Sequence, residues 1–170
     1  MTIFHPLYAE AYARIWHRGQ TYSGGDYADN HLRLVVNSLI DDGQNDDVML
    51  SAAWLHDGPE DAPNAAVRTA RQTLIDAEFG IETGGLVFAV TGIGANRKER
   101  NANAYAKIPV VPRAAILKGH DRFINALTSK HEMPDLHKMY RKEYPGFREL
   151  VAGSISPMLL DALDRAHEPV

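Results

Sequence analysis

The segment from residue 46 to residue 61 constrains the fold more than any other part of the sequence. Residues 48–56 are apolar on almost every face of the helix that they predict, which indicates a central helix buried on all sides. Asp46 and Asp47 can cap its first turn, and Gly58-Pro59 ends it. We therefore expect a short core helix with sharply defined ends.

This core helix ends in charged side chains. His56 and Asp57 close it, and the acidic pair Glu60-Asp61 follows after the break. Because the burial of an unpartnered charge is very costly, a His-Asp pair at a buried helix end needs a ligand. We interpret that ligand as a metal ion, with Glu60 and Asp61 working beside it. The alternative for the acidic pair is an acidic neighbourhood before the next helix, which the helix dipole favours.

Apolar residues recur at helical spacing along most of the chain. This periodicity predicts further helices over residues 4–17, 30–40, 63–79, 113–127, 136–150 and 157–167. Gly80 is predicted to stop the helix over residues 63–79. Residues 82–91 suit a strand by propensity, but their neighbours favour a helix. Gly, Ser and Asp cluster in residues 19–26, which predicts a loop. With no repeat and no linker, residues 1–170 are predicted to form one all-α domain, whose last helices lie within 132–167.

Composition and charge exclude several classes of protein. The chain has no cysteine, which rules out disulfides, cysteine nucleophiles and thiolate metal sites and fits a reducing compartment. A net charge of −4 gives no general attraction to nucleic acid or to an anionic membrane. The N-terminus lacks the pattern of a signal peptide, and no apolar run is long enough to span a bilayer. We expect a cytoplasmic protein.

Two further residues can complete a metal site with His56 and Asp57. His31 lies in the first turn of its predicted helix, and Asp121 lies on the apolar face of another. Helical bundles build metal sites in this way, from inward side chains of facing helices. Two imidazoles and two carboxylates suit Mn²⁺, Fe²⁺, Zn²⁺, Co²⁺ or Ni²⁺ and do not choose among them. A buried salt bridge to an arginine would explain Asp121 equally well.

Several short motifs follow one another in a workable order. They are Trp16-His17-Arg18-Gly19-Gln20, Ala53-Trp54-Leu55-His56-Asp57 with Glu60-Asp61, Val90-Thr91-Gly92, the basic stretch 96–100, and residues 116–125 with the pattern Lys-x-x-Asp-Arg-x-x-Asn. In this order the chain resembles the HD-domain metal phosphohydrolases. More narrowly, it is similar to the ppGpp hydrolase domain of the RelA/SpoT proteins and to stand-alone small alarmone hydrolases. The resemblance covers roughly residues 8–128.

The resemblance implies a fold, a cofactor and a reaction. It implies an HD-type helical bundle, a single Mn²⁺ ion and removal of the 3′-pyrophosphate from an alarmone nucleotide of the stringent response. The residues that would hold the metal are His31, His56, Asp57 and Asp121.

The resemblance also implies roles around the metal. The attacking water would be activated or oriented by Glu60 and Asp61. Asn125 would contact the nucleotide or support the site, and phosphate contacts would come from Lys98, Arg100 and Lys118. For the run Arg97-Lys98-Arg100, the alternative is an ordinary solvated charge run.

The chain departs from this family in three places. Tyr22 stands where the family has an arginine that stacks on the base, and Asp26-Tyr27 replaces a Pro-Tyr pair. His120 stands where the family prefers a small apolar residue. Tyr22 can still stack on a purine, but without a cationic contact. The substrate is therefore predicted to be ppGpp, its adenosine analogue ppApp, or another 3′-phosphorylated nucleotide.

Two other functions fit the sequence. One is an HD-type phosphatase of nucleoside mono- or triphosphates, which Tyr22 favours. The other is a non-catalytic nucleotide sensor or a partner of an alarmone synthetase, which the intact ligand set disfavours. A homo-oligomer and a functional pairing with a synthetase are both compatible with the sequence, which fixes neither.

Overall fold

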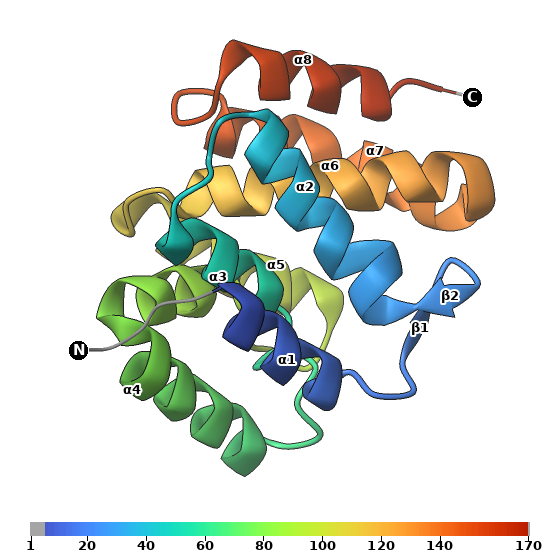
Figure 1. Cartoon of the computed structure of the whole chain (residues 1–170). Helices are drawn as coiled ribbons and strands as arrows, with labels where there is room; N and C mark the ends of the chain where they lie inside the picture. Colours follow the sequence, from blue (N-terminus) through green and yellow to red (C-terminus); the bar gives the residue numbers. More distant parts are fainter. Residues whose placement is uncertain (1–5, 170) are drawn as a thin grey trace.

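Helices make up nearly all of the regular structure in the computed structural model, which describes residues 6–169 (Figure 1). The α-helices are α1 Pro6–Trp16, α2 Arg33–Asp41, α3 Asp47–Leu55, α4 Ala65–Val90, α5 Arg97–Lys107, α6 Ala114–Glu132, α7 Pro134–Val151 and α8 Pro157–Ala166. The prediction of an all-α fold is confirmed. The first helix was predicted to begin at residue 4, and residues 4 and 5 lie outside the described residues.

Helix α3 lies at the centre of the molecule, as its composition predicted. It packs against α1 on one side and α4 on another, and it also contacts α2 (Figure 1). Met49, Ala52 and Leu55 are fully buried. The Asp46 carboxylate accepts a hydrogen bond from the Met49 backbone N–H at 3.1 Å, so the predicted N-cap is confirmed. The core thus holds the end of α3, where the His-Asp pair lies, in a fixed place.

Helix α4 consists of two helical halves joined at a bend. Gly80 lies between them with φ 85° and ψ 162°, a conformation that is nearly restricted to glycine. The Gln72 side chain donates a hydrogen bond of 2.9 Å to the Gly84 carbonyl oxygen, which ties the two halves together. The first of the two helices was predicted to stop at Gly80, and residues 82–91 were predicted to be helical, so both predictions are confirmed.

The prediction of a loop over residues 19–26 is wrong. Strands β1 Thr21–Tyr22 and β2 Gly25–Asp26 form a short antiparallel hairpin, in which Tyr22 faces Gly25. The hairpin leads into a π-helical turn, η1 Ala28–Leu32, which carries His31 and continues into α2. Strands of two residues are too short to show an alternating pattern, so no periodic signal in the sequence predicts them.

The second half of the chain completes the bundle. The polar stretch after Gly94, for which no element was predicted, forms α5, and the turn η2 Ile108–Val110 connects it towards α6. Helix α6 is longer than predicted and packs against α7, α8, α2 and α4. Figure 1 shows α6, α7 and α8 together on one side of the molecule, and α1, α3 and α4 on the other. Within residues 6–169, no helix combines the length and the apolar character needed to cross a membrane.

Candidate metal centre

Four side chains from three elements meet in the interior. His31 comes from η1, His56 and Asp57 follow the last turn of α3, and Asp121 lies in the middle of α6. Asp57 Oδ2 lies 3.2 Å from His31 Nε2 and 3.0 Å from His56 Nε2. Asp121 Oδ1 lies 3.3 Å and 3.5 Å from the same two nitrogens. The Nε2 atom of each histidine therefore faces two carboxylate oxygens, one from Asp57 and one from Asp121.

This cluster has the chemistry of a divalent-metal site. His56 Nδ1 lies 2.7 Å from the Ala53 carbonyl oxygen, so this nitrogen carries the proton and Nε2 presents its lone pair to the cluster. His56 Nε2 is buried and has no hydrogen-bond partner within the described chain. His31, His56 and Asp121 each offer a ligand atom within 4.8 Å of the others, and Asp57 joins them through its contacts to both imidazoles. These four residues fit a divalent cation.

The charges in the cluster depend strongly on one another. Burial acts to lower the pKa of His31 and His56, but the carboxylates of Asp57 and Asp121 raise both above the ordinary value. Burial acts to raise the pKa of the Asp57 carboxyl, but the two imidazoles hold it well below its usual range. The carboxylates are thus anionic at neutral pH, as a site for a cation requires.

Three neighbouring side chains hold the carboxylates of the cluster in place. The Tyr27 hydroxyl donates to Asp57 Oδ2 at 2.7 Å, and the Asn125 side-chain amide donates to Asp121 Oδ1 at 2.6 Å. Lys118 Nζ lies 2.7 Å from Asp121 Oδ2. The buried salt bridge that the sequence allowed for Asp121 is therefore made by a lysine one turn earlier, and not by an arginine.

A polar cavity of about 180 Å³ opens beside the cluster. Its walls include the two carboxylates of the cluster, the acidic pair and several cationic side chains; the lining residues are Tyr27, Asp57, Glu60, Asp61, Arg97, Asn101, Lys118, Asp121, Arg122, Asn125 and Tyr140. The cavity thus combines acids on one part of its wall with cations on another. That combination suits a ligand with negatively charged groups held next to the candidate metal centre.

Glu60 and Asp61 are held in the wall of this cavity. Glu60 Oε2 accepts a hydrogen bond from the Gly92 backbone N–H at 2.7 Å, and Asp61 Oδ2 accepts one from the Gln20 side chain at 2.8 Å. Burial raises the pKa of the Glu60 carboxyl, and burial together with the Asp57 charge raises that of Asp61. Raised pKa values bring both groups closer to the range in which a carboxylate accepts a proton from water.

The structure does not bring all the predicted phosphate and base contacts into the cavity. Lys118 and Asn125 line it, whereas Tyr22, Lys98 and Arg100 do not. Lys98 is exposed on α5. Arg100 lies over the rim, with its Nε 3.8 Å from Glu60 Oε1. Tyr22 lies outside the cavity lining, and its hydroxyl donates a hydrogen bond of 3.0 Å to the side chain of Asn125, which does line the cavity.

Five residues that line the cavity were not candidate site residues in the sequence: Tyr27, Arg97, Asn101, Arg122 and Tyr140. Arg97 donates two hydrogen bonds to Glu143, and Arg122 donates a third to the same carboxylate. Both guanidinium groups also lie within 5.0 Å of the Tyr140 ring centroid. Tyr140 and Glu143 belong to α7, beyond the motifs. The adjacent Asp-Arg in the α6 motif was the one available signal for Arg122.

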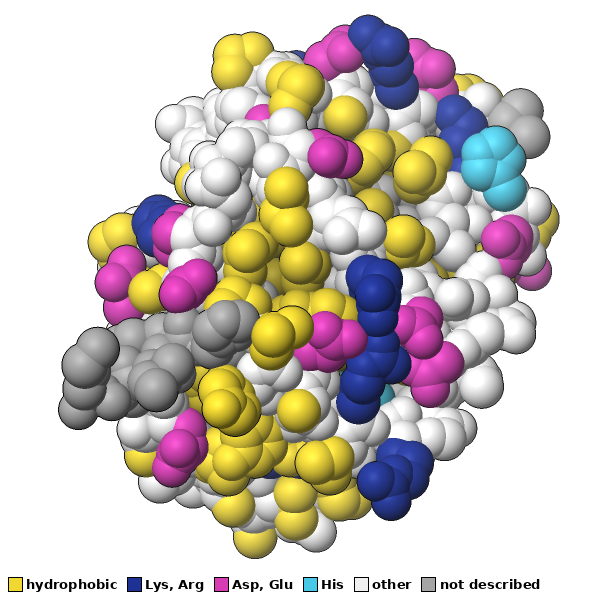
Figure 2. Space-filling view, viewed as in Figure 1, with side chains coloured by type: hydrophobic (Ala, Val, Ile, Leu, Met, Phe, Trp, Pro, Cys, Tyr) yellow, Lys and Arg dark blue, Asp and Glu magenta, His cyan; other side chains and the backbone are white. Residues whose placement is uncertain are grey.

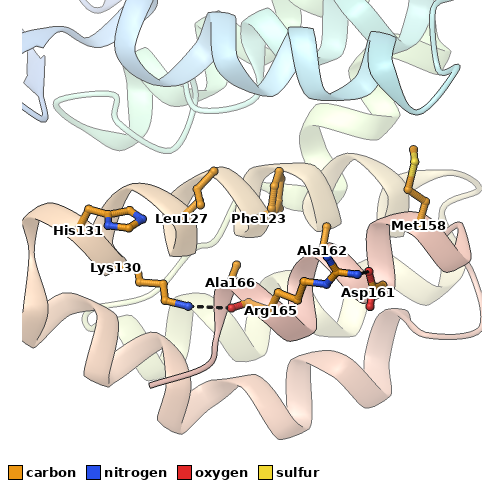
Figure 3. A pocket seen from close by; sticks show the side chains of 9 residues that line it. All are labelled: Phe123, Leu127, Lys130, His131, Met158, Asp161, Ala162, Arg165 and Ala166. Atoms are coloured by element: carbon orange, nitrogen blue, oxygen red, sulfur yellow. Dashed lines mark hydrogen bonds and ion pairs between the residues drawn. The ribbon is translucent and has the colours of Figure 1, made fainter. Parts of the chain in front are cut away.

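A larger cavity lies elsewhere and has a different character. It has a volume of about 500 Å³ and lies between α6 and α8 (Figure 3). Its lining is mostly apolar, with Phe123, Leu127 and Met158 among the lining side chains. Figure 2 shows apolar side chains gathered on the face of the molecule that carries α2, α6 and α8. Asp57 and Asp121 of the His-Asp cluster line the smaller, polar cavity, so the candidate metal centre borders that cavity and not the larger one.

Comparison with known proteins agrees with this architecture. No family model and no curated protein matches the sequence. A solved structure does match: a metazoan ortholog of SpoT that hydrolyses ppGpp, with a TM-score of 0.78 and 21% sequence identity. The match covers 95% of this chain and 92% of that one. The chain therefore shares the helical fold of that protein, and the resemblance inferred from the motifs is confirmed at the level of the fold.

Proposed function

We propose that the protein is a metal-dependent hydrolase that removes the 3′-pyrophosphate from an alarmone nucleotide of the ppGpp or ppApp type. One observation carries the proposal. His31, His56, Asp57 and Asp121 bring their ligand atoms together beside an acidic pair in a polar cavity. The structural neighbour, which hydrolyses ppGpp, supports the proposal because it shares the fold over nearly the whole chain.

The four clustered side chains would hold the metal, and we propose Mn²⁺ for this role. When bound there, a divalent ion would supply Lewis-acid chemistry, by polarising a phosphoryl oxygen and making a nearby water more acidic. Tyr27 and Asn125 would keep the two carboxylates turned towards the cluster through their hydrogen bonds.

Glu60 and Asp61 would serve the attacking water. In the proposed reaction, the water oxygen bonds to the inner phosphorus of the 3′ group, and the bond from that phosphorus to the ribose 3′ oxygen breaks. The water gives a proton to a carboxylate, and the departing 3′ oxygen receives one. The raised pKa values of both carboxyl groups support a proton-accepting role, because such a group works best with a pKa nearer the operating pH.

The cationic wall would bind the pyrophosphate. Lys118, Arg97 and Arg122 line the cavity, and their charges would stabilise the negative charge of the transferring group. Lys98 and Arg100, outside the cavity, would meet the parts of the nucleotide that project from it. Tyr22 was predicted to contact the base. A cytoplasmic location, a homo-oligomer and a pairing with an alarmone synthetase stay predictions.

A second candidate function is an HD-type phosphatase of nucleoside mono- or triphosphates. Tyr22 favours it, because the ring is packed behind Asn125 and lies outside the cavity lining, and it replaces an arginine expected to stack on the base. A substrate screen separates the two functions. We expect pyrophosphate from ppGpp or ppApp and no product from GMP, AMP, GTP or ATP. Release of phosphate or triphosphate from those simple nucleotides, with ppGpp and ppApp left intact, would select the phosphatase.

A further inference from the structure

A chain of hydrogen bonds connects the hairpin to the candidate metal centre. The Tyr22 hydroxyl lies 3.0 Å from Asn125 Oδ1, and Asn125 Nδ2 lies 2.6 Å from Asp121 Oδ1. Asp121 Oδ1 is the oxygen that faces both imidazoles of the cluster. Tyr22 is thus two hydrogen bonds away from a metal-ligand atom, although residues 22 and 121 are far apart in the sequence.

The chemistry of the three groups fixes the direction of these hydrogen bonds. An ionised carboxylate only accepts hydrogen bonds, so Asn125 must turn its NH₂ group towards Asp121. The amide oxygen of Asn125 then faces away from the cluster and needs a donor. The Tyr22 hydroxyl supplies that donor. Without the Tyr22 hydroxyl, the Asn125 amide oxygen loses its donor, so the amide group is less firmly oriented. Its hydrogen bond to Asp121 then weakens.

The hairpin holds Tyr22 firmly in position. Ser23 and Gly24 form its two-residue turn, with φ values of 52° and 76° that suit the tight turns of short hairpins. The side-chain amide of Asn30 donates to the Tyr22 carbonyl oxygen at 3.0 Å, and Ser23 is hydrogen-bonded to Glu132 at the end of α6. The backbone at Tyr22 is therefore fastened to both η1 and α6.

The Tyr22 ring also packs against a candidate ligand. Its centroid lies 5.2 Å from that of the His31 ring and 5.9 Å from that of the Tyr27 ring. Tyr22 does not line the polar cavity, whereas Tyr27 and Asn125 do. In this position the ring supports the cluster from outside and presents little surface to a base within the cavity.

We propose that Tyr22 is a positioning residue of the metal centre, which orients Asn125 and through it Asp121, and is not the platform for the nucleobase. The inference rests on the metal site of the proposed function. It gives the tyrosine at this position a role that replaces base stacking. Because the hairpin positions Tyr22, the conformation of the hairpin then affects the affinity of the site for the metal ion.

The test is a titration of the purified full chain with Mn²⁺ alone, by calorimetry in the absence of nucleotide. Tyr22→Phe keeps the ring and removes only the hydroxyl. We expect Mn²⁺ affinity to fall by about tenfold, the lower end of what loss of a supporting hydrogen bond costs a metal site. Tyr144→Phe is the matched control, because it also removes a tyrosine hydroxyl that donates a side-chain hydrogen bond, in this case to the Asp164 carboxylate away from the cluster. The control should keep the affinity of the wild type.

Asn125→Ala provides the second variant. Because Tyr22 acts through Asn125, adding Tyr22→Phe to Asn125→Ala should weaken Mn²⁺ binding no further. Additive losses in the double variant would contradict the relay. Mn²⁺ affinity within twofold of the wild type in Tyr22→Phe would overturn the inference. Tyr22 would instead be a contact for the nucleobase if two results were found together. Tyr22→Phe would keep the Mn²⁺ affinity, and Tyr22→Ala would raise only the KM for the nucleotide.

The titration separates this inference from the proposed function. A wild type that binds Mn²⁺ and hydrolyses no alarmone would refute the function, and the Tyr22→Phe titration would still decide the inference. A wild type that binds no divalent metal would refute both.

Discussion

At the scale of single residues, Asp57 and Glu60 show how environment gives neighbouring carboxyl groups different roles. Asp57 lies against two imidazoles, which hold its pKa well below the ordinary value and keep it anionic as a candidate ligand. Glu60 is half-buried, accepts a hydrogen bond from the Gly92 N–H, and has a carboxyl pKa that burial raises. One short segment thus provides both a ligand and a group suited to accept a proton.

This difference predicts the effect of removing the Glu60 charge. Glu60→Gln should keep the affinity for Mn²⁺, because Glu60 does not contact the cluster, and should lower kcat by about 10²- to 10⁴-fold, the range for loss of a general base. Steady-state kinetics and a Mn²⁺ titration on the same sample measure both. Glu82→Gln, an exposed change on α4, is the control and should leave both values unchanged. Unchanged turnover in Glu60→Gln would remove this residue from the chemistry.

Residue-level prediction from the sequence succeeded where the signal was local. The end of α3 and the Asp46 cap follow from adjacent residues, so His56 and Asp57 were placed correctly at a buried helix end. The cationic wall was harder to predict. Lys98 and Arg97 are neighbours in the sequence, but consecutive residues point about 100° apart around a helix, so only one of them faces the cavity. Which one does so depends on how α5 packs, which the sequence does not show.

At the scale of elements, the bend in α4 determines how its second half packs. Gly80 adopts φ 85° and ψ 162°, and the chain beyond it leads to Gly92, whose N–H binds Glu60. The bend therefore helps to position the loop that holds a candidate catalytic side chain. The sequence identified Gly80 as a helix stop because glycine at a helix end is a local signal.

Replacing the glycine at this bend should destabilise the fold. Gly80→Ala forces a side chain into a conformation that costs about 1–3 kcal/mol. Gly85→Ala is the matched control in the same element, because a Cβ there meets no atom within 4 Å and alanine favours a helix. Urea denaturation of both variants measures the free energies of unfolding. Equal free energies of unfolding for Gly80→Ala and the wild type would show that α4 accommodates a different backbone conformation at residue 80.

Two elements show the limits of prediction at this scale. The hairpin β1–β2 is too short for a periodic pattern, and its order comes from contacts with distant residues such as Glu132. Helix α5 was left without a prediction because it is polar on nearly all sides, and its Asn96 cap was the sole local sign of a helix. Helix α5 lines the cavity and the hairpin packs against the cluster, so the surroundings of the candidate site were less predictable than the candidate metal ligands.

At the scale of the whole molecule, the C-terminal helices close the bundle over α6 and bring α7 to the cavity. His167 takes part in this packing, since its ring stacks on that of Tyr144 with centroids 3.8 Å apart. Its Nδ1 lies 2.7 Å from the Leu163 carbonyl oxygen, and its Nε2 is buried without a hydrogen-bond partner among the described residues. A proton on Nε2 would therefore introduce a buried and unpaired charge.

This burial predicts how stability depends on pH. Burial lowers the pKa of His167 from its ordinary value of 6.5 to about 4 in the folded protein. The unfolded chain thus binds the proton more readily, so this contribution to stability is complete above pH 6.5 and is lost as the pH falls towards 4. His167→Phe keeps an aromatic ring against Tyr144 without titrating. Its Tm should fall less steeply than that of the wild type between pH 6.5 and pH 4, and parallel curves would contradict this role of His167.

At this scale the fold brings candidate metal ligands from η1, from the end of α3 and from α6 to one point, which supports the proposed function. The most direct measurement is product analysis of ppGpp and ppApp incubated with the purified chain, with added Mn²⁺ or with a chelator, beside the variant Asp57→Ala. We expect pyrophosphate from at least one nucleotide with Mn²⁺, and none with the chelator or with Asp57→Ala. Two intact nucleotides in the presence of Mn²⁺, or equal pyrophosphate release with the chelator, would contradict a metal-dependent alarmone hydrolase.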